Sequence, residues 1–460
     1  MISRPRKRAY VETYGCQMNI SDGELMEGIL AEQGYEIAST AEDADIILVN
    51  TCAIREHAEK RVLGRVGQLY GLKRERPDLV IGVTGCMAQR MGDVLLEQAP
   101  YVDLVMGPDG YRSLPERLEA LEEGRRVMPS RSGKKRGPQL AVLDLNLGEN
   151  YEGLSQRRTS QISAWVPIQR GCDHRCTFCI VPYVRGPEKN RRPEEVIAEI
   201  EAIAASGLTE VTLLGQTVNS YRSGEILFPD LLRSVARIPG IRRVRFTSPH
   251  PNDVTPELLE VMAEEPAVCE QLHLPLQSGS DRVLKRMLRR YTVESFLEKV
   301  QMARRAIPDI ALSADIIVAF PGESPAEFEE TLDVLRTVRF DDAYTYKYSL
   351  REGTPATRLP PEDFVPDDEA QARLARLIEV HREIQGEVNR SEVGRVTEVL
   401  VEKIARQPGQ ILGRTRRNKV VAFQGSPELI ATYQTVSIVS TTNATFVGEL
   451  LDEPVAAARA

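Results

Sequence analysis

One stretch decides what the central part of the chain can be: Cys172-Asp173-His174-Arg175-Cys176-Thr177-Phe178-Cys179. It follows an apolar run that we expect to be a β-strand. Three thiolates spaced in this way on one loop can bind three irons of a [4Fe–4S] cluster, whereas a cluster held by protein alone uses four. The sequence therefore predicts a cluster with one open iron. The alternative is a zinc site with His174 as fourth ligand, which we disfavour because His174 is too close in sequence to close a tetrahedron easily.

Strands and helices alternate from this loop to about residue 385. Helix signals support the pattern: Pro193 stands at the first turn of one predicted helix and Gly207 at its end. Six such units fall short of the eight of a closed barrel, so the sequence predicts a partial (βα)6 barrel over residues 161–388. The six predicted strands are 164–169, 210–214, 243–247, 271–276, 312–320 and 343–350.

Polar or glycine-rich residues follow these predicted strands, and in a barrel such positions share one face. Several of them are candidates for binding a cofactor, although each is equally compatible with a hydrogen-bonded turn or a core role. The candidates are Gln216, Asn219, Ser248, Gln277, Ser278 and Asp315. His250, between two prolines, either lines the same pocket or fixes the turn.

The first 125 residues predict a separate parallel α/β domain, because strand-like runs alternate there with helical ones. Three of its predicted strands each end in a cysteine: Cys16, Cys52 and Cys86. The carboxyl ends of parallel strands meet at one edge of a sheet, so these thiols can converge. We interpret them as the ligands of a second three-cysteine cluster. Taken singly, each is equally a small buried core residue, which is how we interpret Cys269.

Two further segments complete an α/β multidomain architecture. Residues 126–160 predict a linker, because their turn residues and like charges show no periodicity. Residues 389–455 are rich in Val, Ile, Thr and Tyr and predict a small β-barrel. Its basic cluster is a candidate for gripping phosphates, although charge clusters are usually solvated surfaces. The cluster comprises Arg414, Arg416, Arg417 and Lys419.

Composition limits the class of protein. The chain has 460 residues and a net charge of −8, which argues against coating of nucleic acid by charge alone but permits a local basic patch. Seven cysteines in a chain of this size favour metal or catalytic thiolates over disulfides. No apolar run is long enough for a membrane helix, so we expect no membrane partner and a cytoplasmic location. The absence of an obvious exposed apolar stripe predicts a monomer.

The two cysteine sets and their neighbours resemble a known family. The C-x3-C-x2-C loop is similar to that of the radical S-adenosylmethionine (SAM) superfamily, and the whole arrangement resembles the methylthiotransferases. The residues beside the first three cysteines look like the branch that modifies tRNA, the MiaB family, and the C-terminal module looks like the family's TRAM domain. The matching stretches are 14–19, 50–56, 85–86, 181–186, 246–251 and 273–280.

This resemblance implies a substrate, cofactors and partners. The substrate would be the adenosine directly 3′ of the anticodon of tRNA, carrying an isopentenyl group on N6, and the product would carry a methylthio group at C2. The implied cofactors are SAM and two [4Fe–4S] clusters, each held by three cysteines: Cys172, Cys176 and Cys179, and Cys16, Cys52 and Cys86. One SAM would methylate sulfur held on the second cluster, and another would give a 5′-deoxyadenosyl radical. A flavodoxin or ferredoxin would supply the electron. A base in an anticodon loop can leave its stack, which makes this target reachable.

Two other functions stay open at this point. The first is methylthiolation of an aspartate in a ribosomal protein, against which the residues beside Cys16 and Cys52 count. The second is a non-enzymatic iron–sulfur protein that binds RNA and senses iron or oxygen. A sensor needs no substrate-facing pocket, so the open-iron loop on a barrel counts against it.

Overall fold

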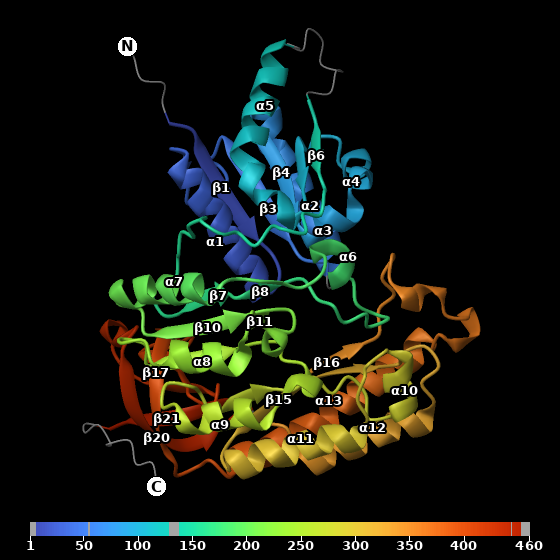
Figure 1. Cartoon of the computed structure of the whole chain (residues 1–460), viewed down its shortest axis with the longest axis vertical. Helices are drawn as coiled ribbons and strands as arrows, with labels where there is room; N and C mark the ends of the chain where they lie inside the picture. Colours follow the sequence, from blue (N-terminus) through green and yellow to red (C-terminus); the bar gives the residue numbers. More distant parts are fainter. Residues whose placement is uncertain (1–5, 54–55, 128–137, 443, 452–460) are drawn as a thin grey trace.

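The computed structural model describes residues 6–53, 56–127, 138–442 and 444–451. In Figure 1 the blue N-terminal sheet stands above the green-to-orange central domain, and the red C-terminal barrel lies beside that domain at the lower left. Ile54 and Arg55, from one of the matching stretches, lie outside the described residues. Among those described, we find no helix with the length and hydrophobicity that a membrane span requires.

The N-terminal sheet is parallel throughout, with the strand order β2-β1-β3-β4-β5-β6. Alternate residues of β3 enter different cores: Ile46 and Leu48 pack with α1 and α5, and Ile47 and Val49 pack with α2, α3 and α4. Because helices cover both faces of the sheet, successive residues of β3 and β4 are buried, and their sequences are continuous apolar runs. The strands are β1 (Arg8–Thr13), β2 (Glu36–Ile37), β3 (Ile46–Thr51), β4 (Val80–Gly85), β5 (Leu104–Met106) and β6 (Leu140–Val142), and the helices are α1 (Gln17–Glu32), α2 (Glu56–Glu75), α3 (Cys86–Met91), α4 (Asp93–Gln98) and α5 (Leu114–Val127).

The predicted linker over 126–160 is wrong from Leu140 onward, and its residues 128–137 lie outside the described part of the chain. Strand β6 pairs with β5 as the sixth strand of the N-terminal sheet. Tyr151 is buried in the core of this domain, and its hydroxyl donates to the carbonyl of Pro108 at 2.5 Å. The backbone N–H of Arg157 also donates to the carbonyl of Glu24. A three-residue strand is too short to show the alternation of apolar and polar residues, and a single buried side chain leaves no repeating pattern. The sequence pattern therefore did not reveal either feature.

The central domain is the predicted partial barrel of six parallel strands. They form two parallel sheets, β7-β10-β13 and β14-β15-β16, joined by a parallel bridge between Val244 and Val268. The fourth strand ends at His273 rather than Leu276, because Pro275 lacks an N–H and Gln277 has a left-handed φ of 65°. The six strands are β7 (Ala164–Pro167), β10 (Glu210–Leu214), β13 (Arg243–Phe246), β14 (Gln271–His273), β15 (Ala311–Val318) and β16 (Asp342–Lys347).

Helices cover the outside of this partial barrel and bury one continuous apolar core against the strands. Thr292 and Ser324 cap two of them with capping boxes. The helices are α7 (Pro193–Ala205), α8 (Phe228–Ala236), α9 (Pro256–Glu264), α11 (Val293–Ala306), α12 (Pro325–Val338) and α13 (Asp367–Arg390). Short elements between them are α6 (Val181–Arg185), α10 (Asp281–Arg286), β8 (Gln169–Arg170), β9 (Lys189–Asn190), β11 (Arg222–Ser223) and β12 (Ile226–Leu227).

The C-terminal module is a closed barrel with the strand order β17-β18-β19-β21-β20, as predicted. Alternate residues of its strands point inward, and Val399, Val401, Phe423 and Phe446 form part of its core. The strands are β17 (Val396–Ile404), β18 (Gln410–Thr415), β19 (Val420–Gln424), β20 (Tyr433–Thr441) and β21 (Thr445–Leu450).

Two buried arginines of β13 attach the C-terminal barrel to the central domain. Arg243, which is 0% exposed, donates to the carbonyls of Arg414 and Glu398 and pairs with the Glu398 carboxylate at 3.0 Å. Arg245 donates to the carbonyls of Thr415 and Arg416. Backbone carbonyls at this boundary are thus satisfied by guanidinium groups rather than by water.

We expect Arg243→Met to loosen this attachment. The change leaves the carbonyls of Arg414 and Glu398 without their donor, and each buried acceptor left unpaired costs about 1–3 kcal/mol. Proteolysis of the native chain near residue 390 should therefore accelerate by about 100-fold or more. Arg242→Met is the matched control, because its pair with Glu398 is about half exposed and should be worth less than about 1 kcal/mol. Equal cleavage rates for the two variants would contradict this account.

Candidate active site

A cavity of about 270 Å³ lies where the N-terminal domain meets the mouth of the partial barrel. Helix α6, which contributes Val181, Val184 and Arg185 to the lining, lies between the blue sheet and the green strands in Figure 1. All six cysteines of the two sets line it: Cys16, Cys52, Cys86, Cys172, Cys176 and Cys179. Cys269 is buried before β14 and lies outside it. The fold therefore brings the six thiols from two domains to one pocket.

The thiols of Cys16, Cys52 and Cys86 each lie at the carboxyl end of a strand. Cys16 stands at the N-cap of α1 after β1, Cys52 follows β3, and Cys86 opens α3 directly after β4. Two glycines make the approach possible. Gly15 has a φ of +140°, and a Cβ there would lie 2.6 Å from the Cβ of Cys52; Gly85 has a φ of +93° and packs against Asn50. Any other residue at these positions would force the strand ends apart.

The first three thiols differ in how readily they ionise. A hydrogen bond from Cys52 lowers the pKa of Cys16 to about 6 against the opposing effect of burial, and the charge of Arg185 lowers it further. Burial raises the pKa of Cys86, which the same guanidinium opposes. Arg185 on α6 donates from Nε to the Sγ of Cys86 at 3.2 Å. A cation at this distance favours the thiolate, the form that binds iron.

The other three thiols lie on the loop between β8 and α6. The Sγ of Cys172 is 3.2 Å from the Oγ1 of Thr217, and the Nη1 of Arg289 donates to the Sγ of Cys176 at 3.3 Å. Burial raises the pKa of Cys172, and it raises the pKa of Cys179 to about 12. Cys172 and Cys179 are therefore held in the neutral form until a metal displaces their protons. Their donors, a hydroxyl and a guanidinium, suit sulfur that carries negative charge.

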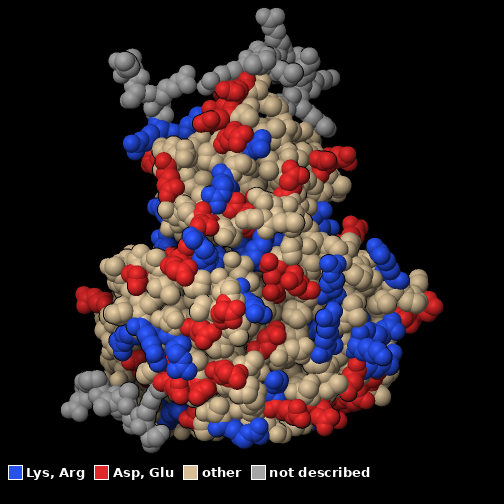
Figure 2. All heavy atoms as spheres, in the orientation of Figure 1, with Lys and Arg blue, Asp and Glu red and all other residues tan. Residues whose placement is uncertain are grey.

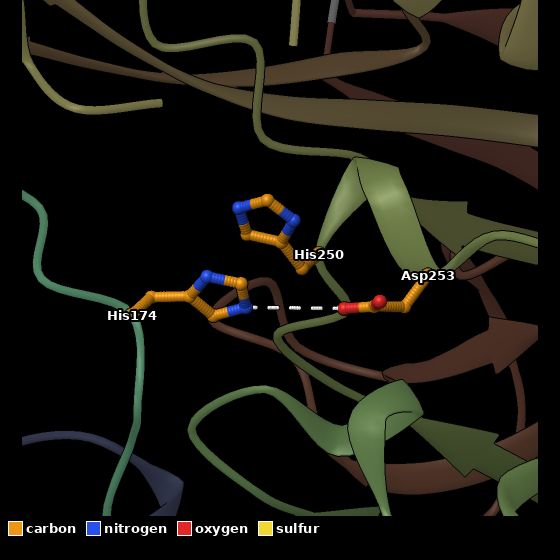
Figure 3. Close-up of side chains that lie close together, drawn as sticks. All are labelled: His174, His250 and Asp253. Carbon is orange, nitrogen blue, oxygen red and sulfur yellow. Dashed lines mark ion pairs between the residues drawn. The ribbon is translucent and has the colours of Figure 1, made fainter. Parts of the chain in front are cut away.

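His174 lies on this loop, but its arrangement is unlike that of a zinc ligand. Its ring stacks on that of His250, with centroids 4.0 Å apart and planes within 9°, and its Nε2 is 3.9 Å from Asp253 (Figure 3). The three side chains hold their ligand atoms within 4.8 Å of one another. Imidazole lone pairs lie in the ring plane, so two parallel stacked rings cannot both point at one ion. Burial, and then the charges of Arg289 and His174, lower the pKa of His250 to about 2, so this ring is neutral.

The candidate cofactor-binding residues divide into two groups. Gln216, Ser248, Gln277 and Asp315 line the cavity. Asn219 does not: its amide donates to the carbonyl of His250 and its Oδ1 accepts the His250 N–H, so it fixes the turn. Ser278 is fully buried, and its hydroxyl accepts the N–H of Ser280.

Two features at the cavity wall suit a polar ligand. The Oε1 atoms of Gln216 and Gln277 are buried and have no hydrogen-bond partner among the described residues. Gln277 and Ser248 also have left-handed φ angles of 65° and 59°. Strained backbone and unsatisfied acceptors both cost free energy, and they gather where a ligand compensates them. Asp315 already accepts a contact from the Nε2 of His273 at 3.2 Å.

The basic cluster of the C-terminal barrel faces acids rather than solvent. Arg414 pairs with Glu402, Arg416 with Glu270, Arg417 with Glu392, and Lys419 with Asp341. Glu270 and Asp341 belong to the central domain, so Arg416 and Lys419 join the two domains, whereas Arg414 and Arg417 pair with acids of the C-terminal module. On the face shown in Figure 2, Lys and Arg lie interspersed with Asp and Glu.

Sequence reasoning missed the residues that contact the thiols: Arg185, Arg289 and Thr217. Arg185 stood inside the quoted stretch 181–186, and Thr217 stood beside the candidate Gln216, so both positions were visible as part of a motif. Nothing in the sequence indicated that Arg289, 113 positions from Cys176, would reach its sulfur.

Comparisons with known proteins agree with this arrangement. The chain matches the models of the radical SAM superfamily over residues 166–335, the uncharacterized protein family UPF0004 over 8–107 and the TRAM domain over 390–451. It is 44% identical to the tRNA-2-methylthio-N(6)-dimethylallyladenosine synthase of Thermoanaerobacter sp. (strain X514), covering 96% of this chain and 92% of that protein. Its identity to the enzyme of the same name from Carboxydothermus hydrogenoformans is 42%, covering 94% and 96%.

Solved structures show the same fold at low sequence identity. The radical SAM methyltransferase TsrM from Kitasatospora setae, with cobalamin and a [4Fe-4S] cluster bound, superposes with a TM-score of 0.56. The two sequences are 15% identical, and the match covers 88% of this chain and 80% of that one. The cobalamin-dependent radical enzyme OxsB gives a TM-score of 0.52 over 82% and 56% of the two chains, also at 15% identity.

Proposed function

Because the chain belongs to the tRNA-2-methylthio-N6-dimethylallyladenosine synthase family, we propose that it transfers a methylthio group to C2 of an N6-isopentenylated adenosine in tRNA. It is a radical SAM methylthiotransferase, and its cofactors include SAM and an iron–sulfur cluster. The observation that carries the detailed proposal is the single cavity lined by six cysteines from two domains.

We propose that two clusters bind in this cavity. Cys172, Cys176 and Cys179 would hold the first, and Cys16, Cys52 and Cys86 the auxiliary one. The donor sets fit, because each offers three thiols and one buried or half-buried arginine within 3.3 Å of a sulfur. When bound, the first cluster supplies the electron that cleaves SAM to a 5′-deoxyadenosyl radical, and the auxiliary cluster supplies sulfur.

The chain's own residues would orient SAM and the target base between these sites. The free Oε1 atoms of Gln216 and Gln277 are acceptors for amino groups, and Asp315 offers a carboxylate. Asn219 and His250 hold the loop after β13 in place. Side chains from both domains line the cavity and would limit the access of water to the reacting atoms.

The partners and domain division are proposed on the same basis. The substrate is tRNA, in keeping with the TRAM domain at residues 390–451. A flavodoxin or ferredoxin would donate the electron, and the chain would act as a monomer in the cytoplasm. We propose domains over 1–125, 161–388 and 389–455, with the part of the 126–160 segment from Leu140 onward packed on the first of them.

We expect Gln277→Leu to weaken SAM binding about tenfold, the effect of losing one hydrogen bond to a charged amino group. Equilibrium dialysis of the reconstituted enzyme measures the dissociation constant. Gln89→Leu is the matched control, because Gln89 also has a buried Oε1 without a partner among the described residues but lies outside the cavity. An unchanged dissociation constant in Gln277→Leu would remove this residue from the proposed site.

Nucleoside mass spectrometry tests the function itself. The reconstituted protein is incubated anaerobically with SAM, a strong reductant and tRNA that has the isopentenyl group but lacks the methylthio group. We expect the methylthio nucleoside to appear, and tRNA without the isopentenyl group to react poorly. Formation of 5′-deoxyadenosine without modified tRNA would redirect the search to an aspartate of a ribosomal protein. Formation of neither, at full iron loading, would favour an iron–sulfur sensor, although the relatives support neither alternative.

A further inference from the structure

Three buried charged side chains lie behind the auxiliary cysteines. Asp22 on α1 sits between Arg185 on α6, at 2.6 Å, and Arg170 on β8, at 3.7 Å. All three are at most 3% exposed. The carboxylate belongs to the N-terminal domain and both guanidiniums belong to the central one, so the group spans the domain interface.

This group carries an excess of positive charge. Two guanidiniums face one carboxylate, and the guanidinium of Arg170 lies 3.6 Å over the ring of Tyr151. The Nε and both Nη atoms of Arg170, and the Nη1 of Arg185, have no hydrogen-bond partner among the described residues. Buried cations without a compensating anion cost several kcal/mol, on the order of the desolvation of one ion. The buried carboxylate of Glu149 also acts on Arg170, so the place that can accept a further negative charge is beside Arg185, at the auxiliary cysteines.

The anion that fits is the auxiliary cluster with its thiolates. Arg185 donates from Nε to the Sγ of Cys86 at 3.2 Å, and its charge also acts on Cys16. Three thiolates outweigh the charge of an oxidised cubane core, so the occupied site is anionic. Adding an electron increases that negative charge, and a nearby cation or an N–H bond to sulfur stabilises the reduced form most.

We propose that Arg185 is a positioning residue that raises the reduction potential of the auxiliary cluster, with Asp22 moderating its effect. This inference rests on the proposed function, because it requires a cluster on Cys16, Cys52 and Cys86. Since Arg185 comes from α6 of the central domain, the potential of the auxiliary cluster depends on the docking of the two domains. Arg289 makes the equivalent contact to Cys176 and gives the other site an internal control.

Redox titration of the anaerobically reconstituted full chain, followed by electron paramagnetic resonance, tests the proposal. Arg185→Met should shift the midpoint potential of the auxiliary cluster to a more negative value and leave the other cluster unchanged. Asp22→Asn should shift the auxiliary cluster the opposite way, because the cation then acts without its counter-charge. Arg289→Met should shift only the midpoint potential of the cluster on Cys172, Cys176 and Cys179. Opposite shifts at one site are not the result that general disruption of packing would give.

Several outcomes would overturn the proposal. They are an unchanged auxiliary potential in Arg185→Met at full iron loading, shifts of the same sign in Arg185→Met and Asp22→Asn, and equal shifts of both clusters. If Arg185→Met loses the auxiliary cluster, Asp22→Asn decides: a positive shift supports the proposal and no shift refutes it. Failure of the proposed function is seen separately, because the unmodified protein would then hold iron for one cluster before any variant is made.

Discussion

A Cys172→Ala variant is expected to form neither 5′-deoxyadenosine nor the methylthio nucleoside. Cys172 is one of three thiols on the loop whose spacing leaves one iron open, and its Sγ is held against Thr217 at the cavity wall. With two ligands left, the cluster that cleaves SAM cannot be retained, so both activities should fall by about a thousandfold or more. Chromatography of 5′-deoxyadenosine and nucleoside mass spectrometry measure the two products in one incubation.

Cys269→Ala is the matched control for this change. Cys269 is the seventh cysteine, it is buried, and it does not line the cavity. Removing one sulfur atom from a packed position should cost about 1–2 kcal/mol of stability and leave both products in place. Substantial SAM cleavage by Cys172→Ala, or its loss in Cys269→Ala, would show that the cluster loop has been assigned wrongly.

Cys86→Ala is expected to separate the two products. SAM cleavage should continue, because the loop of residues 172–179 is intact, whereas the methylthio nucleoside should fall below detection. The physical reason is that Cys86 opens α3 at the end of β4 and faces the cavity beside Arg185, so its loss removes one of three ligands from the proposed sulfur source. The same two assays, together with iron analysis, measure the result.

The iron content gives this second prediction an independent check. It should fall to about half, with the remaining iron in the cluster of the other set. Methylthio product at the unmodified level in Cys86→Ala would mean that the sulfur comes from elsewhere. Loss of SAM cleavage as well would mean that the two sites are not separable.

Much of the fold could be predicted because it depends on local patterns. Cys16, Cys52 and Cys86 each follow an apolar strand, and parallel topology then brings them to one edge. The six strands of the partial barrel are likewise visible because they alternate with helices. Strand β6 could not be predicted because three residues are too few to show the alternating pattern of a strand. Its place in the sheet depends on its pairing with β5.

The parts that could not be predicted depend on contacts between distant residues. Arg416 and Lys419 belong to a basic cluster in the sequence, but their partners Glu270 and Asp341 come from another domain. Asn219 has the same position relative to its strand as a ligand-binding residue, yet its amide is occupied by His250. Arg185 reaches Cys86 across 99 positions. Charge and spacing along the chain carry no information about such pairings.

The most direct test of two clusters in one cavity is Mössbauer spectroscopy with iron analysis of the anaerobically reconstituted chain. We expect about eight irons per chain, all in [4Fe–4S] clusters, and about four in a variant with Cys16, Cys52 and Cys86 all changed to Ala. Addition of SAM should alter the signal of one iron in both proteins. About four irons in the unmodified chain, or no loss of iron in the triple variant, would contradict the account.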